Sequence, residues 1–452
     1  MSSNNQQSAV IGGGLAGIVT ALILAQKGHK VTLIETADTC GGLLQTDYND
    51  DGVPFDYGTH IPKEIGIPGL DSLLFSDFSE DKWQRLDRLR VGGYYRGEMY
   101  PTSQFVNLKL LPEETYNRAV VELLNTSPLD NPAELNALEF SLGMYGETMT
   151  QEIIEPLMQK LYGASLEQLQ PSALGLVGYS RFIAFDRFQT HEIKKSPFYD
   201  SKLGFTTWDD GLSELMNFYP TESGVHIWMD SLLEKLETLG VRILTSTAVD
   251  SVSCENKQVT SIKTSNGETL DVTGLYWTAS PAFLLRALDL PMPEGITPPK
   301  FRSTALVNFV FDRDFQTDLY FFYNHEPDKI TYRTTLYSNL REKNRGEAPY
   351  NCTVEIMSDE ETVHDPELPD KLLKELEEMA IISAEHQVTY QKVIASSKGF
   401  PLPSTGFHKN AVLLTDHCQS QASNIHLFGR ATGKTHFMHD VLAEIWNELN
   451  AS

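Results

Sequence analysis

The stretch AVIGGGLAGIVTALILAQKGHKVTLIE, residues 9–35, decides the fold of this chain. A short apolar strand at 8–12 leads into a glycine-rich turn, a helix with an apolar face follows at 15–27, and an alternating strand at 30–35 ends the unit. Strand, tight turn, helix and parallel strand are the start of a doubly wound, Rossmann-like α/β domain. The stretch therefore predicts such a domain in the first part of the chain.

The glycines of this turn predict a nucleotide site. Gly12 permits the tight turn, and Gly14 lets a pyrophosphate approach the backbone at the N-terminus of the helix. Gly17 lets helix and strand pack closely. Glu35 ends the second strand, where a carboxylate binds a ribose 2′-hydroxyl and repels a 2′-phosphate, so NADP is disfavoured. The alternative interpretation is a glycine-rich turn in an unrelated α/β unit.

Length, composition and charge narrow the class of protein. The 452 residues, 41% of them hydrophobic and 21% charged, predict two or three globular lobes with room for a bulky cofactor. A net charge of -25 disfavours a nucleic-acid partner, because binding phosphates needs a basic face. We find no signal peptide in residues 1–8 and no apolar run of about eighteen residues, so no transmembrane segment is expected.

The cysteines point to a reducing compartment. Their spacing forms no CxxC pair, which disfavours a metal site or disulfides; they are Cys40, Cys254, Cys352 and Cys418. We therefore expect a cytoplasmic protein without a bound metal.

Two further segments indicate which dinucleotide binds. CGGLLQT, residues 40–46, carries Gly41 and Gly42, which allow a second close approach of backbone to ligand that NAD dehydrogenases do not usually need. FDYGTHI, residues 55–61, follows. With these segments the chain resembles the large flavoprotein superfamily of amine oxidases, protoporphyrinogen oxidases, phytoene desaturases and UDP-galactopyranose mutases. In that superfamily such segments contact FAD, so the resemblance implies FAD as the cofactor.

The resemblance extends along most of the chain. Residues 240–281 alternate like a β-meander, whose first strand would pair its backbone with adenine near Val249. NIHLFGRATGKTHFMHDVLAEIW, residues 424–446, resembles the closing strand, loop and helix of the superfamily, with a helix N-terminus aimed at the flavin. The implied FAD contacts are Gly12, Gly14, Leu15, Ala16, Gly17, Glu35, Gly41, Gly42, Leu43, Gly58, Thr59, His60, Val249, Gly429, Arg430, Asp440 and Val441.

The resemblance implies an α/β fold: a Rossmann-like FAD-binding domain of the glutathione-reductase-like type, a mixed-sheet substrate domain and a helical insert. The FAD-binding domain is discontinuous, at 1–75, 224–287 and 401–452. Residues 76–223 form an insert with a hairpin and helices, and residues 288–400 form the substrate-domain sheet and a helix.

Several segments are most similar to the UDP-galactopyranose mutase-like branch, among them YGETMTQEIIEPLMQKLYG at 145–163 and ITYRTTLYSN at 330–339. WDDGLSELMNFY, residues 208–219, resembles the glycine-led helix that returns the chain to the FAD domain. The mutase carries a tyrosine-rich run after its glycine-arginine pair, whereas residues 431–440 here contain no tyrosine. The resemblance therefore indicates the branch of the superfamily but does not identify the substrate.

Four residues are candidates for catalysis. His60 contacts or shields the flavin, or is held only by local backbone; His436 and His439 act as general bases, or merely pack or face solvent. Arg333 binds a carboxylate or phosphate with its bidentate fork, or forms an ordinary cross-strand ion pair.

Three functions stay open. The first is an FAD-dependent oxidoreductase that removes hydride from a small organic substrate: an amine, a porphyrinogen-like molecule or a sugar derivative. The second is a UDP-galactopyranose mutase-like isomerase that acts on a nucleotide sugar with reduced flavin. The third is a non-catalytic, flavoprotein-like assembly factor. The sequence leaves the substrate, the electron acceptor and the oligomeric state open.

Overall fold

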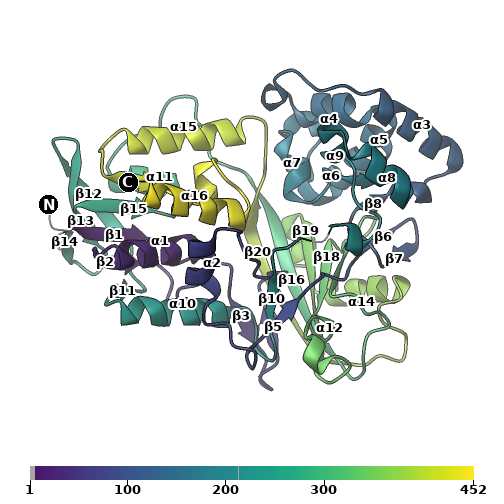
Figure 1. The fold of residues 1–452 in the computed structure, drawn as a ribbon, viewed down its shortest axis with the longest axis horizontal. Helices are drawn as coiled ribbons and strands as arrows, with labels where there is room; N and C mark the ends of the chain where they lie inside the picture. The colour runs from purple at the N-terminus through teal and green to yellow at the C-terminus, as the bar shows by residue number, and fades with distance from the viewer. Residues whose placement is uncertain (1–5, 212, 452) are drawn as a thin grey trace.

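The computed structural model describes residues 6–211 and 213–451, so positions 1–5, 212 and 452 of the predicted segments lie outside the description. Figure 1 shows a Rossmann-like lobe at the left, a large sheet at the lower right and a group of helices above that sheet. The predicted fold class, a Rossmann-like α/β domain with a mixed sheet and a helical insert, is confirmed. The domain boundaries stay a prediction.

A five-stranded parallel sheet, in the order β11-β2-β1-β15-β21, forms the centre of the Rossmann-like lobe. Its strands are β1 (Gln7–Ile11), β2 (Lys30–Ile34), β11 (Arg242–Leu244), β15 (Gly274–Trp277) and β21 (Ile425–Leu427). These strands come from three distant parts of the chain. Since they run parallel, the segments that follow them meet at one edge of the sheet, where ligands bind in such folds.

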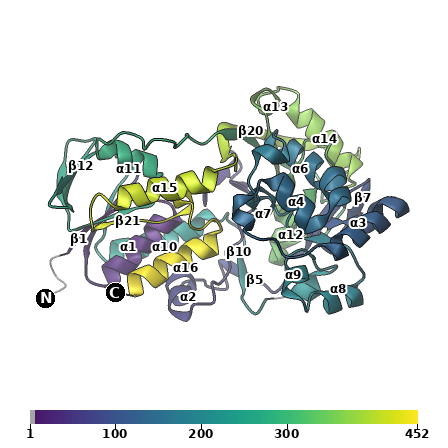
Figure 2. The same ribbon diagram turned by 90° about the horizontal axis from the view of Figure 1, so that it is seen from above.

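Three helices lie together on one face of this sheet: α1 (Leu15–Gln26), α10 (His226–Thr238) and α16 (Met438–Asn450) (Figure 2). Residues 17–24 of α1 are all buried. The helix is apolar on every side because it packs against the sheet and between the other two helices.

The opposite face is covered by α11 (Pro281–Ala287), α15 (Phe407–Gln419) and the predicted β-meander. The meander is antiparallel and consists of β12 (Val249–Glu255), β13 (Gln258–Thr264) and β14 (Thr269–Asp271).

A seven-stranded mixed sheet, in the order β20-β16-β19-β18-β17-β6-β7, forms the second lobe. Its first five strands are β20 (Val388–Pro401), β16 (Phe301–Phe311), β19 (Tyr350–Ser358), β18 (Arg333–Leu336) and β17 (Phe321–Asn324). The hairpin of β6 (Val91–Tyr95) and β7 (Glu98–Tyr100) completes it, because β6 pairs in parallel with β17. Helix α14 (Leu368–Glu378) packs on one face through its apolar stripe.

The helices of residues 113–200 form an apolar core of their own above the seven-stranded sheet in Figure 1. They are α3 (Glu113–Asn125), α4 (Ala137–Tyr145), α5 (Glu147–Met149), a π-helical turn (Thr150–Ile154), α6 (Glu155–Tyr162), α7 (Ser172–Leu176), α8 (Arg187–Ile193) and α9 (Pro197–Asp200). The remaining strands and α-helices of the described chain are β3 (Thr46–Tyr48), β4 (Pro54–Asp56), α2 (Pro68–Phe75), β5 (Trp83–Leu86), β8 (Val106–Asn107), β9 (Phe182–Ile183), β10 (Asn217–Pro220), α12 (Tyr337–Leu340) and α13 (Glu360–Val363).

The helix expected at 208–219 is wrong. The described part of this segment has a 3-10 turn at Trp208–Gly211, and residues 217–220 form β10, which pairs antiparallel with β5. Pairing with a strand more than 120 residues away overrides the local helical pattern here. Among residues 6–211 and 213–451, none of the helices combines the length and apolar character needed to cross a bilayer.

Candidate cofactor and substrate site

The first glycine turn connects β1 to α1, and its glycines are small for different reasons. Gly12 has a φ of +105°, which a side chain rarely adopts. A Cβ on Gly17 would lie 1.8 Å from the Gly12 carbonyl oxygen, so only glycine lets α1 pack on β1. A Cβ on Gly14 would meet nothing nearer than the Gly42 Cα at 4.0 Å. Packing within the protein therefore does not require a glycine at position 14.

The second glycine turn lies against the first. The Gly41 N–H donates to the Gly13 carbonyl over 2.8 Å, and Gly41 and Gly42 have φ values of +128° and +61°. A Cβ on Gly42 would come within 3.2 Å of the Gly14 Cα. Gly42 thus lets the two turns touch, whereas the space beside Gly14 is open. Helix α1 begins beside this space without a side-chain cap, so its N-terminal N–H groups suit an anion.

Glu35 follows β2 at the same edge of the sheet. Its carboxylate accepts hydrogen bonds from the N–H groups of Gly13, over 2.5 Å, and Ala37, over 2.8 Å. The Thr247 N–H donates to the Glu35 carbonyl, which brings the start of β12, with Val249, next to the end of β2. The predicted ribose-binding and adenine-binding residues therefore lie close together.

The segment after β4 carries Gly58, Thr59 and His60. Gly58 has a φ of +105°, and His60 Nε2 lies 3.2 Å from the Tyr57 carbonyl oxygen. Burial and the charges of Arg333 and Arg430 lower the pKa of His60 to about 4, although Glu355 acts in the opposite direction. The imidazole is therefore neutral at neutral pH.

Arg333 is bound to Glu355, its partner across β18 and β19. The guanidinium donates from Nε and Nη2 to the two carboxylate oxygens over 2.8 and 2.7 Å, and from Nη1 to the Tyr323 hydroxyl over 3.3 Å. Its centre lies 5.7 and 5.8 Å from the ring centres of Tyr323 and Tyr332. Of the two interpretations of Arg333, the structure shows the cross-strand ion pair.

Glu355 is not among the site residues predicted from the sequence. A signal was available, because this carboxylate stands within the apolar strand NCTVEIM at 351–357, and an acid that is buried in a strand needs a partner.

The loop after β21 brings Arg430 and His436 to this region. Arg430 is exposed, and its guanidinium has no hydrogen bond or ion pair within the described residues. Burial, together with the charges of Arg430 and His408, lowers the pKa of His436 to about 4. The charge of Arg430 acts on both His60 and His436, which places these two candidates in a cluster around Arg430, and Arg333 acts on His60 alone of the two.

The last predicted site residues belong to the first turn of α16. His439 is exposed over 64% of its side chain, lies 3.0 Å from the Asp440 carboxylate and stacks on Phe437. Val441 packs into the core between α16 and α1, and its N–H donates to the Phe437 carbonyl over 3.1 Å. No side chain caps α16, which leaves the N–H groups of its first turn, before Val441, without a capping side chain.

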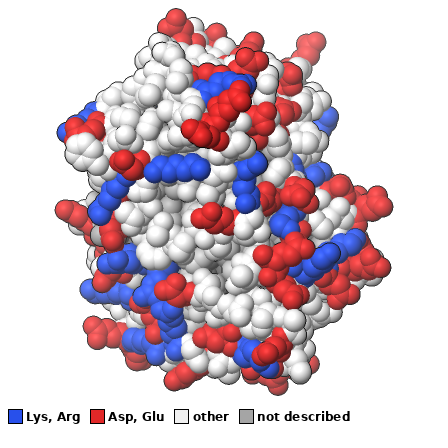
Figure 3. Space-filling view, turned by 90° about the vertical axis from the view of Figure 1, so that its right-hand side faces the viewer, with Lys and Arg blue, Asp and Glu red and all other residues white. Residues whose placement is uncertain are grey.

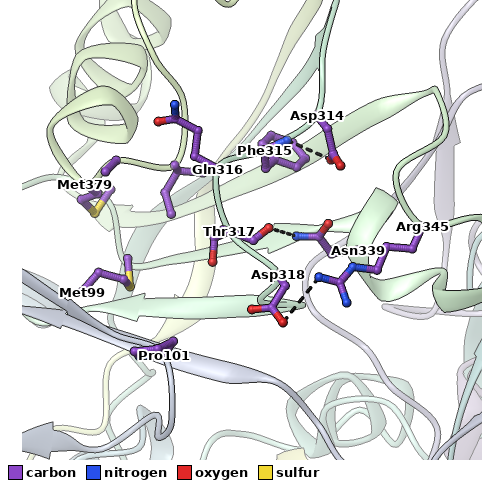
Figure 4. Close-up of a pocket in the computed structure, with 12 residues that line it drawn as sticks. Met99, Pro101, Asp314, Phe315, Gln316, Thr317, Asp318, Asn339, Arg345 and Met379 are labelled. Carbon is purple, nitrogen blue, oxygen red and sulfur yellow. Dashed lines mark hydrogen bonds and ion pairs between the residues drawn. The ribbon is translucent and has the colours of Figure 1, made fainter.

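A cavity of about 570 Å³ lies elsewhere in the molecule, between the β6–β7 hairpin, the loop at 314–318 and the end of α14 (Figure 4). Asn339 donates to the Thr317 carbonyl over 2.9 Å, and Arg345 lies 3.4 Å from Asp318. The residues that line this cavity include none of the predicted cofactor or catalytic residues.

Known proteins share this architecture. Residues 10–66 match the family of the NAD(P)-binding Rossmann-like domain. The chain is 29% identical over 143 residues to an L-amino-acid oxidase of Vipera ammodytes ammodytes, 25% over 281 residues to a 4,4'-diaponeurosporene oxygenase of Staphylococcus aureus, and 23% over 274 residues to a coproporphyrinogen III oxidase of the same species. These alignments cover 28%, 57% and 55% of this chain, and 30%, 52% and 55% of the relatives.

Solved structures resemble the whole chain. A reduced UDP-galactopyranose mutase superposes with a TM-score of 0.77 at 18% identity, over 99% of this chain and 96% of the mutase. A putrescine oxidase bound to putrescine superposes with a TM-score of 0.62 at 13% identity, over 99% of this chain and 98% of the oxidase. The resemblance to the FAD-dependent amine oxidase and protoporphyrinogen oxidase superfamily, with its UDP-galactopyranose mutase-like branch, is therefore confirmed in the fold.

Proposed function

We propose that this chain is an FAD-dependent oxidoreductase that removes hydride from a small organic substrate, such as an amine, a porphyrinogen-like molecule or a sugar derivative. The observation that carries the proposal is the open space beside Gly14, where a Cβ would meet no protein atom nearer than 4.0 Å, at the uncapped N-terminus of α1. A glycine at position 14 keeps this space free of side-chain atoms, as the close approach of a pyrophosphate requires. The similarity to oxidases supports the reaction class.

The residues present fit FAD. Gly14, Gly42 and the N-terminus of α1 would hold the pyrophosphate, Glu35 the ribose, and the backbone near Val249 the adenine. The flavin end would lie between the loop at 58–60 and the cluster around Arg430. When bound, FAD supplies the acceptor for a hydride.

The chain's own groups would position the substrate and stabilise charge. Arg430 and the N-terminus of α16 place positive potential where negative charge develops when hydride arrives. His60 and His436 are neutral at neutral pH, so each can accept a hydrogen bond from a substrate N–H or O–H group. Arg333 contributes little net charge because Glu355 neutralises it.

The test begins with the purified full chain. We expect a yellow protein that releases FAD on denaturation, and anaerobic mixing with amines, porphyrinogens and sugar derivatives should bleach the flavin with one of them. A colourless protein that takes up no FAD from solution would overturn the proposal of a flavoprotein. A flavin that none of these donors reduces would overturn the proposal of an oxidoreductase.

A mutase-like isomerase is the second candidate, supported by the superposition of UDP-galactopyranose mutase on 99% of this chain. It predicts conversion of a nucleotide sugar only after the flavin has been reduced with dithionite, with no net consumption of reductant. Activity with oxidised flavin, or consumption of reductant in step with product, would exclude it.

A further inference from the structure

Glu355 makes the contact between the loop at 58–60 and the seven-stranded sheet. The N–H and hydroxyl groups of Thr59 both donate to Glu355 Oε1, over 3.1 and 2.9 Å. The same carboxylate receives two hydrogen bonds from Arg333 on the neighbouring strand. The Thr59 hydroxyl also contacts that of Thr335. Donors from two lobes, far apart in sequence, thus meet at one carboxylate.

The carboxylate lies directly against the turn of the loop. A Cβ on Gly58 would come within 3.4 Å of Glu355 Oε2. The side chain of Glu355 is only 13% exposed and that of Arg333 20%. Burial acts to raise the pKa of Glu355, but Arg333 and the hydrogen bonds from Thr59 outweigh it and hold the pKa below its usual value. The pair is therefore charged at neutral pH.

We propose that Glu355 is a positioning residue that fixes the loop at 58–60 against Arg333 and neutralises the positive charge of Arg333 beside the flavin end of the site. This inference rests on the proposed binding of FAD, and it assigns a role to a residue that is not among the predicted site residues. Without the carboxylate, the loop loses two of its bonds and Arg333 becomes an unbalanced buried cation.

The two parts of this role predict different signals. An unbalanced cation near the flavin favours the reduced, negatively charged form, so the flavin midpoint potential rises. Loss of the loop contacts alone weakens FAD binding but leaves the charge balance intact. Glu355→Gln tests the charge, because glutamine has the same shape and can still accept a hydrogen bond from Thr59. Thr59→Ala tests the loop contact, because it keeps the pair of Arg333 and Glu355.

The matched control is Glu375→Gln. Glu375 is another buried carboxylate beside the same sheet, which accepts hydrogen bonds from the Ile330 and Thr331 N–H groups and from the Thr331 hydroxyl. Glu375 belongs to α14, and within the described residues it forms no hydrogen bond with the loop at 58–60. It should affect stability without affecting the flavin.

The experiment uses the FAD-loaded full chain and measures the midpoint potential against reference dyes, the flavin absorbance spectrum and the dissociation constant for FAD. For Glu355→Gln we expect the equilibrium constant for flavin reduction to rise at least tenfold, about 30 mV for a two-electron couple. For Thr59→Ala we expect about fivefold weaker FAD binding with an unchanged potential. Glu375→Gln should match the wild-type chain in both.

A Glu355→Gln protein that binds FAD with wild-type potential and spectrum would overturn the inference, and so would a Thr59→Ala protein with wild-type affinity if Glu355→Gln does not fold. An equal shift in the control would also overturn it. A wild-type chain that binds no FAD would instead refute the proposed function, so the two failures are distinguishable.

Discussion

Gly14 and Gly17 lie three residues apart in one turn, but a side chain would have different consequences at the two positions. An alanine at position 14 meets no protein atom closer than 4.0 Å, whereas an alanine at position 17 would press on the Gly12 carbonyl at 1.8 Å. Two single substitutions can therefore distinguish a glycine that leaves room for a ligand from a glycine that allows the helix to pack on the strand.

We predict that Gly14→Ala folds with nearly wild-type thermal stability but binds FAD about tenfold more weakly, a loss of ~1.4 kcal/mol. Gly17→Ala should lose about 3 kcal/mol of unfolding free energy through overpacking, whether or not FAD is present. Urea unfolding of the FAD-free proteins and titration with FAD measure both. Equal FAD affinity in Gly14→Ala and wild type would contradict the assignment of this turn.

His325 is the residue for which we predict an acid response. It is buried between the rings of Tyr100 and Tyr323, with Nδ1 3.0 Å from the Tyr179 hydroxyl. Burial, aided by the charge of Lys160, lowers its pKa from 6.5 to about 3. Between these values the unfolded chain binds the extra proton, so stability is complete above pH 6.5 and falls as the pH drops.

This single site should cost about 1.4 kcal/mol per pH unit as the pH falls through this window. Unfolding free energies of wild type and His325→Gln, measured by urea between about pH 4 and 8, give the dependence. The variant should show a shallower slope below pH 6.5, even if its stability under mildly alkaline conditions is lower. Parallel curves would show that His325 does not titrate in this way.

At the scale of the element, α4 offers the most local test. Asn136 accepts a hydrogen bond from the Glu139 N–H over 2.9 Å, and the Glu139 carboxylate accepts one from the Asn136 N–H over 3.1 Å, which together form a capping box. We predict that Asn136→Ala costs about 1 kcal/mol of unfolding free energy. Exposed Glu134, just outside the cap, is the control, and Glu134→Ala should leave the urea midpoint unchanged.

Elements with a strong local signal could be predicted from the sequence. The glycine turn, α1 and β2 follow from spacing and periodicity alone, and the meander at β12–β14 follows from alternation. The segment that became β10 could not be predicted, because its structure depends on pairing with β5. In the site, the glycines and Glu35 could be predicted because their spacing is recognisable in the sequence. The contacts of Glu355 with Arg333 and Thr59 could not, because they form only when distant parts of the chain pack together.

At the scale of the whole molecule, the distribution of charge bears on which groups can bind. Figure 3 shows acidic side chains over much of one face, with basic ones between them, as the net charge of -25 leads one to expect. The single guanidinium of Arg430, for which no ion pair is found among the described residues, therefore stands out against an acidic protein, and a negatively charged group would find few competing sites.

We predict that a chain that ends after α15, at Gln419, cannot fold its Rossmann-like lobe, because it lacks strand β21 and helix α16, which covers α1. Circular dichroism and limited proteolysis should show an unfolded N-terminal region, with residues 7–34 cleaved first. A truncated chain with a cooperative urea transition at the wild-type midpoint would contradict this.

The control for this truncation is a chain that ends at Asn450, the last residue of α16. It keeps every strand of the five-stranded sheet and loses, from the described part of the chain, only the exposed Ala451. We expect it to unfold at the wild-type midpoint. If both truncations lower the midpoint equally, the loss reflects shortening of the chain rather than the missing strand and helix.

The order of strands in the five-stranded sheet has a consequence for synthesis. Strand β1 leaves the ribosome roughly 20–80 s before β21, at the usual rate of translation. During that interval the apolar surface of α1 has neither its sheet nor its covering helix complete. The nascent chain must therefore be shielded by other means until β21 and α16 emerge.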